Sequence, residues 1–144
     1  MQLTFNLQQP IEMVFDYLTD MQKFVSVHPV ITKMDWLSAN KYLVHETLTF
    51  GFIPVSFTYP VTIDQNDKDK TIVMRATVMK MTKIEMNYKL DRFNGLTTID
   101  ETITIKSFLP IRAVMERIFR KQHGLLFQNI EAVPFYTFLF QKFG

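Results

Sequence analysis

The sequence contains no cysteine, which excludes disulfide bonds, thiol nucleophiles and thiolate metal sites. It also contains no run of about 20 apolar residues, so it predicts no transmembrane helix. The first residues, Met1–Phe5, lack a basic segment followed by an apolar run, and this argues against a signal peptide. From these absences we expect a cytoplasmic protein.

The common motifs of catalysis and nucleotide binding are missing as well. There is no GxGxxG and no GxxxxGK[ST] pattern, so nucleotide binding has no support. No HExxH pattern or clustered carboxylate–histidine spacing is present, and no Ser–His–Asp set can be named, so we expect no metal, no cofactor and no assigned catalytic residue. The net charge of +2 is too small to indicate nucleic-acid binding.

The residues that are present favour one folded domain over positions 1–144. Hydrophobic residues make up 47% of the 144 positions, enough for a sizeable core and well outside the range of disordered chains. The 14 Phe provide bulk, and the 9 Met provide adaptable walls that suit both a core and a permissive pocket.

One long helix is predicted from Ile111 to Val133, just after Pro110. At about 1.5 Å per residue it is roughly 35 Å long, enough to cross a small domain. Gln122 and Asn129 fall on or beside its apolar stripe, which predicts a lined space beneath the helix. The stripe consists of Ile111, Met115, Ile118, Leu125, Leu126, Ile130 and Val133.

Almost everything before this helix is predicted to be sheet. An alternating first strand, Leu3–Leu7, precedes two short helices, the first opened by Pro10 and the second capped by Asp20. Pro60 predicts a bulge or an edge. Because one sheet face is apolar, we expect an α+β fold in which a strongly curved antiparallel sheet of about seven strands wraps around the helix. The further strands are Val30–Leu37, Lys41–Phe50, Ile53–Ile63, Thr71–Lys80, Thr82–Arg92 and Thr97–Lys106.

This order of elements resembles the START/Bet v 1-like (SRPBCC) superfamily, and its bacterial polyketide cyclase/dehydrase-like branch in particular. The segments Ile11–Asp20, Lys121–His123 and Gln128–Glu131 carry the resemblance. It implies a helix-grip fold that holds a hydrophobic ligand between sheet and helix. The turn Ser38–Lys41 lacks the glycine-rich loop of the plant allergens, so no phosphate or nucleotide role is inferred for it.

Two carboxylates interrupt the apolar face of the predicted sheet. Glu46 is in phase with Val44, and Glu101 is in phase with Ile99, so both are expected to point at the helix. An unpaired carboxylate in an apolar space costs several kcal/mol, or its pKa rises until it is neutral. Three interpretations stay open: a hydrogen-bonded structural position, a polar anchor for a ligand, and a general acid or base.

Other polar side chains have two interpretations each. Tyr42, Tyr59 and Tyr88 share the inward phase and are expected in the core or in a ligand-contacting wall. Gln122 and His123 either contact a ligand or mark a kink before Gly124 with a solvated histidine, and the kink is the simpler expectation.

The leading functional hypothesis is a non-enzymatic protein that binds a hydrophobic or amphipathic small molecule, of lipid, polyketide-like or isoprenoid-like type, between sheet and helix. A cyclase or dehydratase type of enzyme is the alternative, with Glu46 or Glu101 transferring protons. The predicted ligand-binding residues are Tyr42, Val44, Glu46, Phe57, Tyr59, Met74, Met86, Tyr88, Glu101, Met115, Ile118 and Gln122.

A third hypothesis is an interaction module that uses basic and aromatic surfaces. The apolar tail Phe135–Phe140 is either core or an interface, and the oligomeric state, monomer or dimer, stays open. Contact with a membrane is an alternative here, not the favoured one. The basic cluster on the helix consists of Arg112, Arg117, Arg120 and Lys121.

Overall fold

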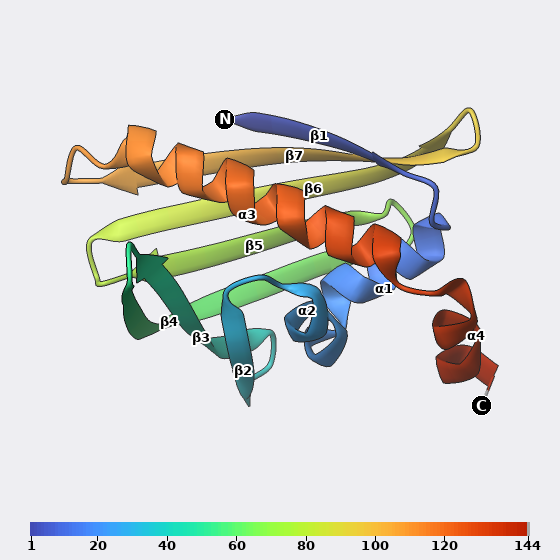
Figure 1. Cartoon of the computed structure of the whole chain (residues 1–144), viewed down its shortest axis with the longest axis horizontal. Coiled ribbons are helices and arrows are strands. Elements are labelled where there is room, and N and C mark those ends of the chain that lie inside the picture. Colours follow the sequence, from blue (N-terminus) through green and yellow to red (C-terminus); the bar gives the residue numbers. More distant parts are fainter. Residues whose placement is uncertain (144) are drawn as a thin grey trace.

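The described part of the chain forms seven strands and four helices (Figure 1). The strands and the first three helices follow the predicted order, whereas the fourth helix, Phe135–Phe143, lies in the aromatic tail, for which no helix was predicted. The computed structural model describes residues 1–143, apart from the side chains at positions 141 and 143. The elements are β1 (Gln2–Leu7), α1 (Ile11–Thr19), α2 (Met21–Val27), β2 (Ile31–Ser38), β3 (Lys41–Phe50), β4 (Ile53–Asn66), β5 (Thr71–Val78), β6 (Thr82–Phe93), β7 (Leu96–Ser107), α3 (Arg112–Ala132) and α4 (Phe135–Phe143).

All seven strands form one antiparallel sheet in the order β1-β7-β6-β5-β4-β3-β2. Helix α3 lies across one face of this sheet (Figure 1). Alternate strand residues, such as Ile72, Ile99 and Ile103, are buried on that face because side chains on a strand point to opposite sides in turn. The predicted α+β helix-grip architecture is therefore confirmed.

Strand β4 pairs with both of its neighbours along only part of its length. It pairs with β3 from Ile53 to Thr62, but with β5 only from Val61 to Asn66. Pro60, which lacks an N–H for a ladder, is the last residue before pairing with β5 begins. The first half of β4 is thus an edge, one of the two alternatives predicted for Pro60. Because β3 pairs with β2 only up to Glu46, the tip of the β3–β4 hairpin, residues 48–50 and 53–55, is a two-stranded ribbon (Figure 1).

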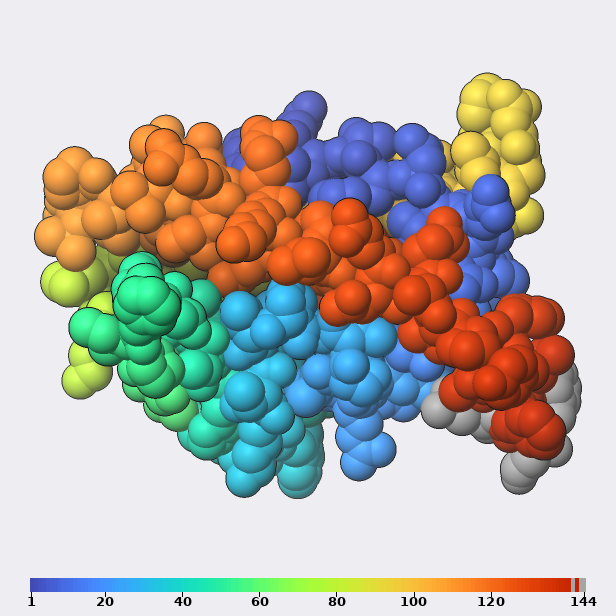
Figure 2. Space-filling model, in the orientation of Figure 1, coloured from blue at the N-terminus to red at the C-terminus, as the bar shows by residue number. Residues whose placement is uncertain are grey.

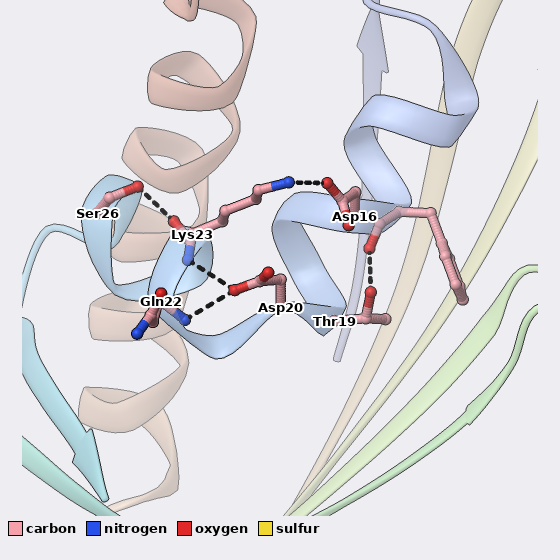
Figure 3. A network of polar contacts seen from close by, with 7 residues as sticks. Asp16, Thr19, Asp20, Gln22, Lys23 and Ser26 are labelled. Atoms are coloured by element: carbon pink, nitrogen blue, oxygen red, sulfur yellow. Dashed lines mark hydrogen bonds and ion pairs between the residues drawn. The ribbon is translucent and has the colours of Figure 1, made fainter. Parts of the chain in front are cut away.

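A polar network fixes the corner between α1 and α2 (Figure 3). The Asp20 carboxylate accepts hydrogen bonds from the backbone N–H groups of Gln22 and Lys23, which confirms the predicted cap. Lys23 in turn forms an ion pair with Asp16. The two short helices therefore meet at a defined angle and bring α2 beside α3.

The second half of α3 is packed tightly against the sheet. Leu126, Phe127 and Ile130 are buried, and the Phe127 ring stacks on Phe5 of β1 with ring centroids 4.5 Å apart. Leu125, predicted in the buried stripe, is instead 39% exposed, because the contact with the sheet runs through the next position, Leu126. This half of the helix leaves no room for a ligand.

Polar contacts hold the C-terminal end of α3 in place. The Glu131 carboxylate accepts hydrogen bonds from the backbone N–H groups of Gln8 and Gln9, and the Gln9 amide donates to the Val133 carbonyl at 2.7 Å. The Asn129 amide donates to the Val27 carbonyl at 2.8 Å. With one end anchored in this way, the first half of α3 projects over the open part of the sheet.

The aromatic tail is neither wholly core nor wholly interface. Phe138 of α4 is buried, whereas Tyr136 and Phe140 are 63% and 72% exposed. Helix α4 follows the C-terminal end of α3, so it lies far from Arg112 at the opposite end (Figure 1). No helix in the described part of the chain is long and apolar enough to cross a membrane.

Candidate functional site

A cavity of about 290 Å³ lies beneath the first half of α3. Its floor is formed by β3, β4, β5 and β6, and its roof by α3. The walls are almost entirely apolar, and we place the opening of the cavity at Phe50 and Met79, which are the most exposed lining residues at 55% and 74%. The lining consists of Glu46, Leu48, Phe50, Val55, Phe57, Tyr59, Ala76, Val78, Met79, Ile84, Met86, Ile111, Met115, Ile118, Phe119 and Gln122.

A recess of about 40 Å³ extends the cavity toward α2. The two spaces share five lining residues, Glu46, Tyr59, Met86, Phe119 and Gln122. The recess also touches His28, Tyr88 and His123, so it is the more polar part. The site is therefore graded from an apolar mouth to a polar inner end.

Glu46 and Tyr59 form the polar pair at the boundary between cavity and recess. They lie on neighbouring strands β3 and β4, and the Tyr59 hydroxyl donates a hydrogen bond to Glu46 Oε1 at 2.7 Å. Burial raises the pKa of Glu46, and the hydrogen bond from Tyr59 opposes that rise. Burial and the neighbouring carboxylate raise the pKa of Tyr59 well above its usual value, so this hydroxyl stays a donor.

Gln122 faces the pair from the helix. It is 7% exposed, lines both spaces, and its side chain makes no hydrogen bond with any other described residue. Because this side chain borders both spaces, its donor and acceptor groups are available to a ligand or to water.

Behind the recess, Glu101 and His123 form a buried pair. His123 Nδ1 lies 2.8 Å from Glu101 Oε1 and 2.6 Å from Oε2, and the two residues are 3% and 1% exposed. Tyr88, directly opposite Glu101 in the β6–β7 register, stacks on the His123 ring. The expectation of a solvated histidine is wrong, because the His123 ring is buried in contact with the Glu101 carboxylate of β7.

His28 closes the recess from the end of α2. Its Nδ1 accepts hydrogen bonds from the backbone N–H groups of Val30 and Ile31 at 3.2 and 3.0 Å. Burial, with a smaller contribution from the nearby His123, lowers the pKa of His28 to about 3. The ring is therefore neutral at physiological pH, and its proton sits on Nε2.

Ten of the twelve predicted ligand-binding residues line the cavity or the recess, and two do not. Tyr42 lies outside both and sits near the β2–β3 turn, opposite Trp36 of β2. Glu101 lies outside because His123 stands between it and the recess. Both carboxylates do point inward, as expected, but only Glu46 borders the open space.

Several lining residues were not predicted. Phe119 contributes to both spaces, and a signal for it existed, since it lies four positions after Met115 on the same helical face. His28 gave no signal, because it follows a short helix and its approach to the recess depends on the α1–α2 corner. Among the described residues, no three His, Asp or Glu side chains are grouped to hold a metal ion.

Solved structures with the same fold span nearly the whole chain. Ara h 8.0201 superposes with a TM-score of 0.70 at 16% identity, over 91% of this chain and 93% of that chain. The Zhui aromatase/cyclase from Streptomyces sp. R1128 gives a TM-score of 0.66 at 10% identity, over 91% and 90%. The chain spans about half, 46%, of the di-domain ARO/CYC BexL from the BE-7585A biosynthetic pathway, with 91% of this chain covered, a TM-score of 0.77 and 10% identity.

These similarities establish the fold and confirm the resemblance to Bet v 1-like and polyketide aromatase/cyclase proteins at that level. No protein-family model matches the chain, and no curated protein matches its sequence.

Proposed function

We propose that this protein binds a hydrophobic or amphipathic small molecule in the cavity beneath α3. The observation that carries the proposal is an apolar space of about 290 Å³ that is open at one end and has polar groups only at the other. Ligand sites are typically apolar clefts of roughly 300–1,000 Å³ with a few well-placed polar groups. The cavity lies at the small end of that range, so the ligand is small or enters only in part.

Apolar contact alone supports useful affinity. A ligand that buries roughly 300 Å² of apolar surface gains about 7 kcal/mol at ~25 cal/mol per Å², before the costs of association. This energy depends on shape and volume, so it does not select a particular compound. Selection is left to the inner polar groups.

The inner end favours a ligand with a hydrogen-bond donor, such as a hydroxyl or an amine. Glu46 accepts one hydrogen bond from Tyr59, and its remaining acceptor capacity faces the open space. Gln122 offers both a donor and an acceptor across from it. An amphipathic ligand is therefore expected to enter with its polar end first and leave its apolar part near Phe50 and Met79.

Filling the cavity tests the proposal. Ile118→Trp places an indole ring in the cavity in place of a smaller aliphatic side chain. Val114→Trp, one turn earlier, adds the same ring at a position that is 53% exposed. We expect I118W to lower the affinity for a fluorescent apolar probe such as 1-anilinonaphthalene-8-sulfonate by tenfold or more, and V114W to leave it unchanged. Equal affinities for the two variants, both folded by circular dichroism, would contradict the proposal.

Native mass spectrometry of the purified protein gives the class of the ligand. A co-purifying mass that is lost on denaturation supports binding, and its absence from I118W locates it in the cavity. A mass that persists in I118W at the wild-type level would place the ligand elsewhere.

Enzymatic proton transfer is the second candidate, and Glu46 is the observation that favours it. A carboxyl with a raised pKa, hydrogen bonded to a phenol beside an apolar cavity, has the features of a general acid or base. Glu46→Gln separates the candidates. A binding protein keeps its affinity for an apolar probe within a few-fold, whereas an enzyme loses roughly 10²–10⁴-fold in turnover of a β-ketone substrate.

A further inference from the structure

The mouth of the cavity is surrounded by three chain connections at one end of the molecule. Successive strands are antiparallel, so the β3–β4 turn, the β5–β6 turn and the β7–α3 loop all lie at the same end of the sheet. Residues of all three line the cavity near its opening, among them Phe50, Met79 and Ile111. Figure 2 shows these segments gathered at that end in green, yellow-green and orange. We call them the rim.

Each rim segment has at least one apolar side chain that is exposed to solvent. Phe52 of the β3–β4 turn is fully exposed at 101%, Phe108 of the β7–α3 loop is 94% exposed, and Met79 of the β5–β6 turn is 74% exposed. Exposed apolar groups concentrated in one region mark an interaction surface. Further exposed apolar residues on or next to the rim are Phe50, Ile53, Met81, Leu109 and Val114.

The charges around the rim are almost all positive. The segments 48–56, 77–83 and 106–118 contain five basic residues and only one acidic residue, Glu116. The opposite end of the sheet is closer to neutral, since the segment 64–70 carries three acidic residues, Asp64, Asp67 and Asp69, and two basic residues, Lys68 and Lys70. The rim segments thus carry an excess of four positive charges at the end of the sheet where the cavity opens. The five basic residues are Lys80, Lys83, Lys106, Arg112 and Arg117.

We propose that the rim docks on a lipid bilayer that contains anionic headgroups, so that a ligand passes between the bilayer and the cavity. Apolar side chains enter the boundary between headgroups and acyl chains, while Lys and Arg remain with the anionic headgroups. The most exposed apolar residues stand on three separate chain connections. Such a surface suits a fluid layer that closes around each side chain. The passage of ligand rests on the proposed function, but the docking itself does not.

Sedimentation with lipid vesicles tests the docking. We expect the wild-type protein to bind vesicles of phosphatidylcholine and phosphatidylglycerol in equal parts, and to bind pure phosphatidylcholine vesicles more weakly. The double variant Phe52→Ser/Phe108→Ser removes two rings from the rim and is expected to lower binding by roughly tenfold or more. Phe93→Ser is the matched control, because Phe93 is 70% exposed but lies at the β6–β7 turn, at the opposite end.

Charge is tested separately. Lys80 and Lys106 are exposed and make no ion pair with a described residue. Each lysine near an anionic surface strengthens binding by roughly fivefold, so Lys80→Ala/Lys106→Ala is expected to weaken binding to the mixed vesicles by roughly 25-fold. Added salt is expected to weaken wild-type binding in the same direction.

Three results would overturn the proposal. They are no binding to either vesicle, equal losses in F93S and F52S/F108S, and a self-association in solution that the rim variants abolish while vesicles are ignored. The last result would assign the rim to a second copy of the chain.

Failure of docking can be told apart from failure of the proposed function. Phe52 and Phe108 do not line the cavity, so F52S/F108S is expected to bind the apolar probe like the wild-type protein when no vesicles are present. The cavity variant I118W is expected to keep vesicle binding. Loss of probe binding in F52S/F108S would show that its weaker docking reflects damage to the fold, and would remove that variant's support for the proposal.

Discussion

Acid is expected to destabilise this protein through His28, and His28→Asn is the change that tests it. The His28 ring accepts two backbone hydrogen bonds through Nδ1, and burial holds the folded-state pKa at about 3 instead of 6.5. The oxygen of an asparagine side chain reaches nearly the same position as Nδ1 and accepts the same bonds, but it does not titrate. H28N therefore removes the proton-binding site and keeps the hydrogen bonds.

The magnitude follows from proton linkage. Between pH 6.5 and about 3 the unfolded chain holds the His28 proton and the folded chain does not, so the free energy of unfolding falls as the pH falls. Each pKa unit is worth about 1.4 kcal/mol, so wild type loses about 3 kcal/mol through this residue between pH ~7.5 and pH ~4. Typical domains are stable by roughly 5–15 kcal/mol, so the loss is a large fraction of the total.

Urea unfolding followed by circular dichroism across this pH range gives the answer. We expect the wild type to lose about 3 kcal/mol more than H28N on acidification, because every other titrating group is common to both. His28→Gln is the control for the hydrogen bonds, since its longer side chain displaces the acceptor and is expected to cost stability at every pH. Parallel pH profiles for wild type and H28N would refute the reasoning.

Three further predictions concern other polar groups. His123→Phe leaves the buried Glu101 carboxylate without its partner and is expected to lower the free energy of unfolding by about 3–5 kcal/mol. The double variant His123→Phe/Glu101→Leu is expected to recover most of this loss, because no carboxylate remains buried. Additive losses of the two changes in urea unfolding would contradict the pairing. Because burial raises the pKa of Glu46 above 4.5, the folded state holds its proton longer, so stability is expected to fall in wild type but not in Glu46→Gln as the pH rises from about 4.5 through that raised pKa. The same slope in both proteins, measured by thermal unfolding, would show that Glu46 is solvated. Asp20→Ala removes the cap of α2 and is expected to cost about 1 kcal/mol, whereas Asp20→Asn is expected to cost little; an equal loss in both would assign the effect to charge instead.

The arrangement of the elements could be predicted because it depends on local patterns. Alternation places Val61, Ile63 and Met74 on one face wherever the strands pair, and the sheet confirms it. Helical periodicity likewise placed α3 within one residue of its observed bounds. It did not fix the rotation of the helix finely enough to separate Leu125 from Leu126, since neighbouring positions differ by only about 100° around the axis.

The depth of the site could not be predicted in the same way. Alternation tells which face a side chain joins, but the curvature of the sheet and the anchoring of α3 decide whether it meets the helix or an open space. Tyr42 and Tyr59 have the same phase, yet only Tyr59 reaches the cavity. Glu101 and His123 are 22 positions apart on different elements, so their pairing arises only when α3 lies on β7.

The partial pairing of β4 has a consequence for the entry of a ligand into the cavity. Phe50 and Val55, which border the opening, belong to the stretch of the β3–β4 ribbon that has no ladder to β5. The tip of this ribbon, residues 48–50 and 53–55, pairs with neither β2 nor β5, so an outward movement of the tip breaks no ladder hydrogen bond to either strand. We therefore expect a ligand wider than the opening to enter by displacing this tip, while the fully paired part of the sheet keeps its position.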